Sequence, residues 1–238
     1  MSLPTPPYRR HRSRSGAAAG SAALARSLAL LAVSIGVIST LHAAEPARYE
    51  LTITNTNTGQ NFSPPVIVIH DPQWQMFELG EPASEPLWRL AEDGAAGGFR
   101  ELAAPGVDQV LVGQSVHRRN SPVYSTVIEA LPDRLVSVAA MLTLTNDGFM
   151  AAQRLALPRA AGESATVPLL AYDAGSEANT ESCDHVPCEV HGQRMTEGAE
   201  GTVREHPGIR GDVDIPERRG WQDPKLGQLT VTRLPEPG

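Results

Sequence analysis

The chain has 238 residues, 41% of them hydrophobic, and is therefore long enough to bury a substantial core within one domain. Acidic side chains outnumber basic ones by 27 to 20, which gives a formal net charge of −7 at pH 7. Such a surface repels phosphate backbones and anionic lipid head groups, so the composition argues against nucleic-acid and peripheral-membrane roles and favours cations and basic partners.

The first 44 residues are typical of a secretory signal peptide. Five arginines and no acidic residue stand in the first 26 positions, and residues 27–40 (SLALLAVSIGVIST) form an apolar run shorter than a bilayer span. The small residues Ala43 and Ala44 follow, so we expect cleavage after one of them and an exported protein, periplasmic or secreted, without a membrane span; an uncleaved membrane anchor is the alternative. Cleavage would leave 15 basic against 27 acidic residues, a net charge of −12.

Two strands and a helical segment are predicted in the first half of the remaining chain. Residues 49–56 (YELTITNT) alternate apolar and polar side chains, the pattern of a half-buried strand, and residues 66–70 (VIVIH) form a short β-branched run. Residues 84–94 (SEPLWRLAEDG) predict a helix, because a proline occupies the first turn and a glycine ends the segment. A second helical turn is expected over residues 99–104.

Strand composition returns in the second half, over residues 107–112, 123–130, 135–145, 166–170 and 226–234. The run LVSVAAMLTLT at 135–145 is apolar on both parities, which predicts a central strand covered on both faces. A polar, glycine-containing excursion separates the last two strands. We therefore predict an all-β, antiparallel β-sandwich with short helical insertions over residues 45–238, in which the first and last strands pair.

One stretch, AYDAGSEANTE, packs three carboxylates and an amide into nine residues, and such a segment is either a solvated loop or a site for a positive ion. If neighbouring strands end at the same rim, its Asp173 can converge with Asp147 of LTNDGF, a geometry that suits Ca²⁺ and its oxygen ligands. Asn146 and Glu177 are additional candidate ligands. The alternative is that both segments are ordinary turns, in which Asp and Asn cap their own backbone.

Five segments together resemble the spondin N-terminal domain as found in bacterial exported proteins: YELTITNT, FSPPVIVIHD, TNDGF, AYDAGSEANTE and EHPGI. The resemblance covers about residues 49–234. It implies a C2-like antiparallel sandwich of about eight strands with a calcium ion at one end, and its motif aspartates fall on Asp147 and Asp173. The family's third carboxylate falls near Ile128, with Glu129 beside it. Animal relatives such as F-spondin and mindin are extracellular-matrix proteins with roles in cell adhesion.

The two cysteines, Cys183 and Cys188, lie in the segment CDHVPCEVH. In an exported chain they are expected to form a disulfide that staples the polar excursion. A second interpretation takes the two cysteines with His185 and His191 as four zinc ligands.

Residues Arg210, Gly211 and Asp212 match the integrin-binding tripeptide Arg-Gly-Asp. We interpret this match as a turn. Trp74, Trp88 and Trp221 are predicted to pack against the core; the alternative is a sugar-binding platform.

The sequence holds no nucleophile elbow, HExxH motif, phosphate-binding loop or dinucleotide fingerprint. The first functional hypothesis is therefore an exported, non-catalytic spondin-like binding or adhesion module that binds calcium and meets an extracellular or envelope protein or a glycan. The second is a periplasmic metal-binding protein or metalloenzyme that uses the Cys/His cluster.

Overall fold

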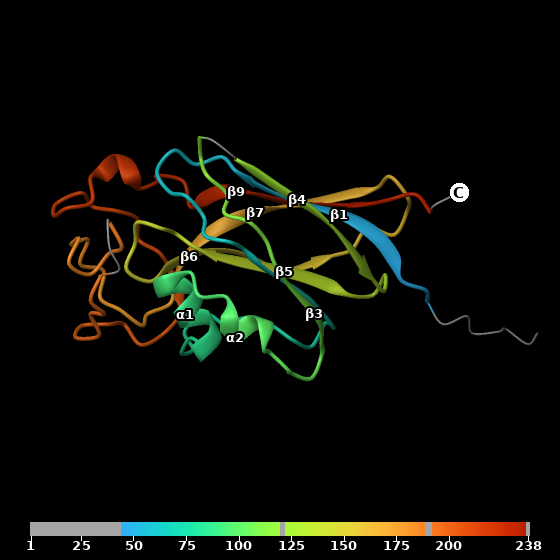
Figure 1. Cartoon of the computed structure of the whole chain (residues 1–238), viewed down its shortest axis with the longest axis horizontal. Coiled ribbons are helices and arrows are strands. Elements are labelled where there is room, and N and C mark those ends of the chain that lie inside the picture. Colours follow the sequence, from blue (N-terminus) through green and yellow to red (C-terminus); the bar gives the residue numbers. More distant parts are fainter. Residues whose placement is uncertain (1–43, 120–121, 189–191, 237–238) are drawn as a thin grey trace, which may run out of the picture. The chain divides into compact units, whose positions relative to one another are not determined.

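The computed structural model describes residues 44–119, 122–188 and 192–236, so the predicted signal peptide lies outside the described residues apart from its last position. Strands dominate this part of the chain, together with two short α-helices and one 3-10 turn (Figure 1). The elements, in chain order, are β1 (Ala47–Asn55), β2 (Val66–His70), α1 (Glu85–Asp93), α2 (Gly97–Arg100), β3 (Val107–Val112), β4 (Val123–Ala130), β5 (Leu135–Met141), β6 (Gly148–Ala156), β7 (Ser164–Asp173), β8 (Arg204–Glu205), η1 (Glu217–Arg219) and β9 (Lys225–Arg233).

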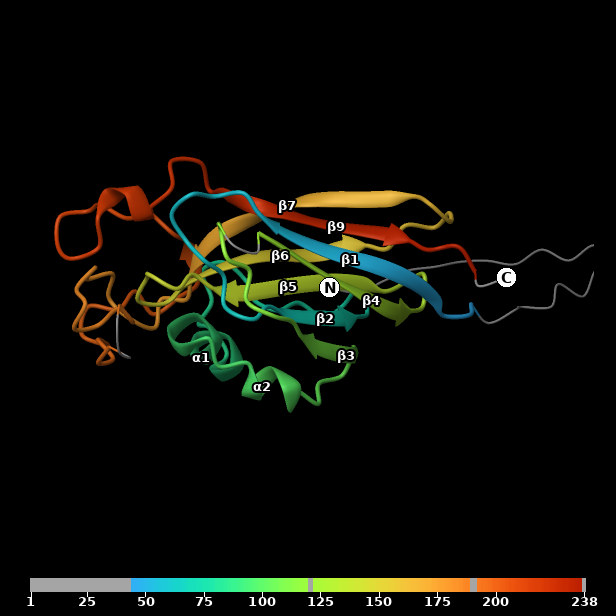
Figure 2. The ribbon, with the colours of Figure 1, turned by 45° about the horizontal axis from the view of Figure 1, so that its top comes forward.

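The strands form one continuous antiparallel sheet in the order β3-β2-β5-β6-β7-β9-β1-β4, with the short β8 added to β7. The sheet curls, so that β1, β7 and β9 lie in a layer across β2, β5 and β6 (Figure 2). The predicted all-β, sandwich-like fold with short helical insertions is confirmed. The first and last strands pair as expected, with Tyr49 opposite Arg233.

The space between the layers is filled by alternate residues of the strands. In β1, Tyr49, Leu51 and Ile53 are fully buried, whereas the residues between them are more accessible. They meet apolar side chains of β2, β5 and β9 in one cluster. Burying a large apolar side chain contributes roughly 1.5–3 kcal/mol, so this alternation fixes which face of β1 turns inward.

The second core lies on the other face of β2 and β5, under the helices. Leu87 and Leu90 of α1 and Phe99 of α2 pack there against Val68 and Ala139. Helix α1 ends at Gly94, whose φ of 67° gives the left-handed cap that ends the helix. Because α1 and α2 cover this face, β5 is buried on both sides and lies between β2 and β6, which confirms the predicted central strand.

The sequence interpretation missed β6 and extended β5 too far, to residue 145 instead of Met141. The sequence of β6, GFMAAQRLA, lacks both alternation and β-branched residues, so no local pattern indicates a strand. Burial between β5 and β7 holds it in place. Arg154, in β6, has a positive φ of 61°. It lies close to the point where the register of the β5–β6 pairing shifts, between Val136 and Val138.

One end of the sandwich carries the long excursion between β7 and β9, residues 174–224 (Figure 1). The start of β6, the end of β7 and the start of β9 all lie at this end, because Gly148 pairs with Asp173 and Leu170 pairs with Lys225. We call it the loop end. It contains most of the candidate site residues.

Candidate functional site at the loop end

The structure brings Asp147 and Asp173 together. Asp147 immediately precedes β6 and Asp173 ends β7, and Gly148 pairs directly with Asp173 across the two strands. The amide of Ala174 donates a hydrogen bond to the carbonyl oxygen of Asp147 at 3.1 Å, which ties the two strand ends together. Both aspartate side chains are fully buried.

The Asp147 carboxylate has one satisfied and one unsatisfied oxygen. Its Oδ2 accepts hydrogen bonds from the amides of Ser176 and Glu177, at 2.7 and 2.9 Å, and from the Ser176 hydroxyl at 3.2 Å. Its Oδ1 is buried without a hydrogen-bond partner among the described residues. Burial, followed by the negative charge of Asp173, raises the pKa of Asp147 to about 7.

Asp173 is surrounded by donors. Its Oδ1 accepts from the amide of Gly175 at 2.7 Å, and its Oδ2 accepts from the side-chain amide of Asn179 at 2.5 Å and from the Arg204 guanidinium at 3.2 Å. Arg204 also forms an ion pair with Glu200, and its side chain is 41% exposed. A positive side chain of the protein therefore stands beside the carboxylate pair.

The other two candidate ligands, Asn146 and Glu177, also lie at the loop end, where they accept hydrogen bonds from backbone amides. Asn146 Oδ1 accepts from the amides of Thr180 and Glu181, at 3.1 and 3.3 Å. Glu177 Oε1 accepts from the amide of Met195 at 2.7 Å, and burial raises the pKa of Glu177 to about 7. Both side chains are buried. Asn146 thus holds the excursion to the end of the sheet, and Glu177 connects two parts of the excursion.

Glu181 is a further buried carboxylate at the loop end. It is not among the candidate calcium ligands predicted from the sequence. Its two carboxylate oxygens accept from the amides of Arg210 and Gly211, at 2.7 and 2.8 Å, and its side chain is only 5% exposed. The signal for it was the density of carboxylates in AYDAGSEANTE. These carboxylates do not lie in a solvated loop, because each is buried and accepts backbone N–H groups. Asp147 and Asp173 still repel each other, and this repulsion contributes to the raised pKa of Asp147.

Glu129 does not join this group. It is exposed near the end of β4 and pairs with Arg48, at the beginning of β1, whereas Asn55 at the other end of β1 pairs with Gly227 near the loop end. Seven residues of β1 separate these points, roughly 23 Å at about 3.3 Å per residue. A ligand set that contains Glu129 together with Asp147 is therefore wrong.

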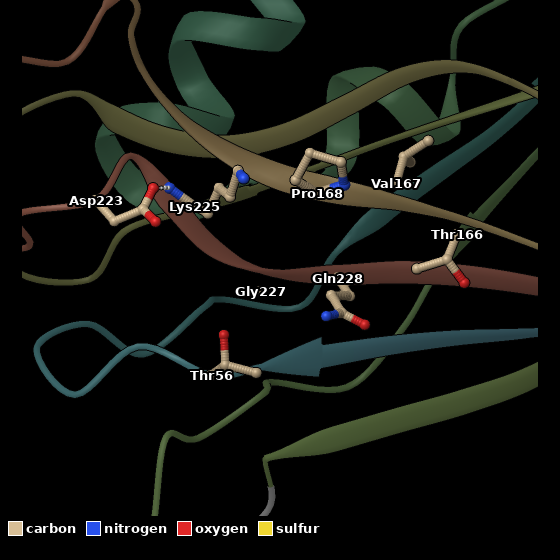
Figure 3. Close-up of a pocket in the computed structure, with 8 residues that line it drawn as sticks. All are labelled: Thr56, Thr166, Val167, Pro168, Asp223, Lys225, Gly227 and Gln228. Atoms are coloured by element: carbon tan, nitrogen blue, oxygen red, sulfur yellow. Dashed lines mark hydrogen bonds between the residues drawn. The ribbon is translucent and has the colours of Figure 1, made fainter.

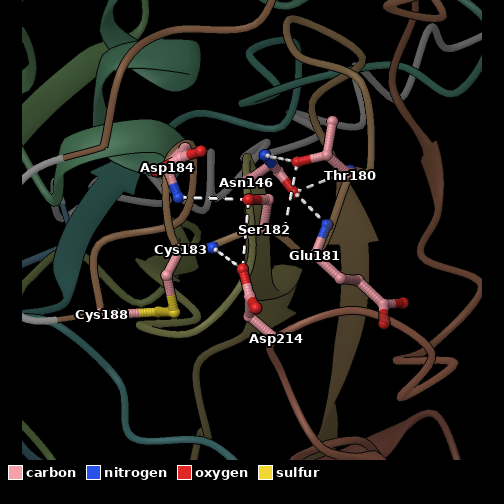
Figure 4. The surroundings of a disulfide bond; sticks show 8 residues. All are labelled: Asn146, Thr180, Glu181, Ser182, Cys183, Asp184, Cys188 and Asp214. Carbon is pink, nitrogen blue, oxygen red and sulfur yellow. Dashed lines mark hydrogen bonds between the residues drawn. A yellow bond between two sulfur atoms is a disulfide. The ribbon is translucent and has the colours of Figure 1, made fainter.

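Cys183 and Cys188 form the predicted disulfide, with an S–S distance of 2.09 Å (Figure 4). Both sulfurs are bonded, so the zinc hypothesis loses its two thiolates and is wrong for this state of the protein. His185 instead hydrogen-bonds the Thr180 hydroxyl at 3.0 Å, and His191 lies outside the described residues.

The disulfide-bonded segment is anchored by Asp214. One oxygen of this carboxylate accepts from the amide of Cys183 at 2.9 Å and from the hydroxyl of Ser182 at 3.2 Å (Figure 4). The excursion thus repeats one device: a carboxylate from one part of the chain fixes backbone from another.

The Arg210-Gly211-Asp212 tripeptide lies in an irregular segment that enters a bend at Asp212. Gly211 has a φ of 81°, and the Arg210 guanidinium lies 3.3 Å from the carboxylate of Asp212. The amides of Arg210 and Gly211 are held by Glu181, as described above. The side chains of Arg210 and Asp212 are both exposed, at 58% and 63%, so this ion pair lies at the surface.

His206 is a buried neutral imidazole beneath the site. Its Nδ1 accepts from the amide of Gly208 at 3.0 Å, so the proton is on Nε2, which is buried without a partner among the described residues. Burial lowers the pKa of His206 to about 4, although the charge of Asp173 acts in the opposite direction. The ring packs against Trp221 at a centroid distance of 4.9 Å.

The three tryptophans pack as predicted, each partly buried. Trp221 packs on the core between the layers, and Trp74 and Trp88 pack on the helix-covered core. Arg194 lies over the ring of Trp88, 4.2 Å from its centroid.

A hollow of about 380 Å³ lies beside β7 and β9 (Figure 3). Thr56, Pro168 and Gln228 line it, and at its end Asp223 Oδ1 accepts from the amide of Lys225 at 3.0 Å.

Within the described residues, no group of three or more His, Cys, Asp or Glu side chains is arranged to hold a metal, and no helix is long and apolar enough to cross a membrane. The chain matches no protein-family model. A comparison with curated proteins likewise finds no match.

Proposed function

We propose that the mature chain is an exported, non-catalytic, spondin-like binding module whose loop end meets an extracellular or envelope protein or a glycan, and that Ca²⁺ between Asp147 and Asp173 stabilises this end. The sequence resemblance, the leader-like N-terminus and the disulfide support the proposal. The sandwich scaffold with long loops gathered at one end supports it as well, because binding residues commonly lie on loops held by a rigid scaffold.

The observation that carries the calcium proposal is the unpartnered, buried Oδ1 of Asp147. A buried carboxylate oxygen without a donor costs free energy, and a hard cation would compensate it. Asp173 supplies the second carboxylate. Only two carboxylates face each other here, so the remaining ligands would be carbonyl or water oxygens, which Ca²⁺ accepts.

Arg204 already compensates part of the charge of Asp173, so calcium binding requires this guanidinium to withdraw. The exposure of the Arg204 side chain gives it room to do so, and Glu200 remains as its partner. Calcium would also displace the proton that the raised pKa of Asp147 retains near neutral pH. Its binding should therefore be weaker at pH 6 than at pH 8.

Thermal unfolding of the mature protein in millimolar Ca²⁺ and in chelator tests the proposal. A ligand at 100 times its Kd stabilises the folded state by about 2.7 kcal/mol, so the melting temperature should rise with Ca²⁺. Asp147→Asn should abolish the rise, whereas Glu129→Gln, which removes an exposed carboxylate at the far end, should keep it. Equal melting temperatures of the wild type with and without calcium would refute the calcium site.

A further inference from the structure

Four arginines gather in one pocket that the proposed function does not use. Arg118 and Arg119 lie in the turn that follows β3, and Arg218 and Arg219 lie in η1. Together with Thr58 they line a hollow of about 380 Å³. The mature chain has 15 basic residues against 27 acidic ones, so this local excess of positive charge runs against its composition.

Buried polar side chains hold the two arginine-bearing segments in place. Asn55 Nδ2 donates to the carbonyl oxygens of Gln60 and Val116, at 3.0 and 3.3 Å, which fixes the turn that leads into Arg118. Gln60 Nε2 donates to the carbonyl oxygen of Arg219 at 2.7 Å. One polar pair thus connects segments about a hundred residues apart, and the convergence of the arginines is built into the fold.

The backbone packing around the pocket is equally close. A Cβ atom on Gly59 would come within 2.2 Å of the carbonyl oxygen of Arg219, so only glycine allows this approach. The amide of Arg118 donates to Asn61 Oδ1 at 3.2 Å. Both arginine-bearing segments therefore pack against the loop between β1 and β2.

Within the part of the chain that the structure describes, no carboxylate lies within ion-pairing distance of these four arginines. The Nε of Arg118 is buried and has no hydrogen-bond partner among residues 44–119, 122–188 and 192–236. Burial, followed by the charges of Arg119 and Arg219, lowers the pKa of Arg118. Like charges held together around an unsatisfied donor are unfavourable unless an anion lies between them.

We propose that this pocket binds an oxyanion, the phosphate or sulfate group of a ligand. Guanidinium groups recognise such oxygens through paired N–H donors, and the Thr58 hydroxyl adds a further donor at the wall. Carboxylates of the protein are absent from the lining, which leaves the donors available to a bound anion.

An adjoining hollow offers room for the group that carries the anion. It has a volume of about 550 Å³ and shares Thr58 and Arg218 with the arginine pocket. It is also lined by Ile209, Trp221 and one acidic residue, Glu217. An aromatic ring beside a cationic pocket suits a sugar or another ring that bears a phosphate or sulfate. The proposal is independent of the calcium site, since the two share no residue.

Calorimetric titration of the mature protein with sodium sulfate, sodium phosphate and, as the control anion, sodium chloride at constant ionic strength tests the proposal. Dextran sulfate and plain dextran form a second arm. We expect saturable sulfate or phosphate binding. Its affinity should fall about tenfold or more in Arg118→Gln and in Arg218→Gln. The Arg218 side chain is exposed, so its replacement leaves the core intact. The double variant Arg48→Gln/Arg100→Gln removes two exposed arginines elsewhere and should bind as the wild type does.

Tighter binding of dextran sulfate than of inorganic sulfate, with the same dependence on Arg118, assigns the anion to a polymer; equal affinity per sulfate assigns it to a small ligand. Absence of saturable binding in both arms overturns the proposal, as does equal weakening in the Arg48→Gln/Arg100→Gln control. In anion-free buffer, Arg118→Gln should melt at the same temperature as the wild type or higher, because it removes repulsion. A large decrease would show that Arg118 has an internal partner and would also overturn the proposal.

Discussion

Two long connections of the sheet are held by different forces. The connection between β2 and β3, residues 71–106, contains both helices and buries large apolar side chains, among them Phe77, Leu87, Leu90 and Phe99. The connection between β7 and β9, residues 174–224, has little regular structure, and the buried apolar side chains in its described part, 174–188 and 192–224, are Ala174, Val186, Val203 and Ile215. It instead buries carboxylates.

The difference follows from where backbone polar groups find partners. A helix satisfies its own N–H groups and is free to use its side chains for apolar packing. An irregular segment leaves its N–H groups without partners, and buried ones must be satisfied by other acceptors. Asp147, Asp173, Glu177, Glu181 and Asp214 supply those acceptors in the second connection. The acidic stretch that first suggested a cation site is therefore also a structural device.

The largest expected effect is in the helical connection. Leu90→Ala removes a fully buried side chain under α1 and should lower the free energy of unfolding by about 2–5 kcal/mol, measured by urea denaturation. Leu79→Ala, at a leucine that is 53% exposed, is the matched control and should change stability by less than about 0.5 kcal/mol. If the two variants were equally stable, apolar packing would not hold this connection.

A smaller, local effect is expected in the irregular connection. Glu181→Gln replaces a buried carboxylate that accepts two backbone amides, and hydrogen bonds to charged groups are worth about 1.5–3 kcal/mol. Hydrogen exchange should accelerate at Arg210 and Gly211 and stay unchanged in α1. Glu129→Gln is the control of the same chemistry on an exposed site. Uniform acceleration throughout the domain would mean that the two connections unfold together.

The smallest effect is a pH dependence confined to the loop end. The pKa of Asp147 is raised to about 7 from the usual 3.8, so the folded state holds a proton that the unfolded state releases. Its stabilising contribution is present below about pH 4 and is lost as the pH rises through 7. In chelator, between pH 6.5 and 8, the free energy of unfolding should fall by about 1 kcal/mol for this group.

Asp147→Asn should remove that part of the fall and leave the contribution of Glu177, whose pKa is raised to the same value. His206 has the opposite sign, because its lowered pKa costs stability as the pH falls below 6.5, so it contributes little in this window. A profile for Asp147→Asn identical to that of the wild type would show that Asp147 is ionised throughout.

Local patterns were sufficient for much of the fold. The alternation of YELTITNT, the β-branched run VIVIH and the proline and glycine that bound α1 each indicate structure through interactions between residues close in sequence. The spacing of Cys183 and Cys188 likewise predicted the disulfide. The alanine-rich β6 was not predicted from the sequence, because pairing with its neighbours in the sheet, and no local pattern, makes it a strand.

For the candidate site, the residue types were readable and their partners were not. The sequence by itself determined that carboxylates concentrate in AYDAGSEANTE and that Asp147 follows the strand predicted over residues 135–145. Only the tertiary structure decided that Asp147 and Asp173 meet, that Arg204 stands beside them, that Glu129 lies at the far end, and that four arginines share a pocket. These placements depend on the pairing order of strands and on contacts between segments tens of residues apart, which no local periodicity encodes.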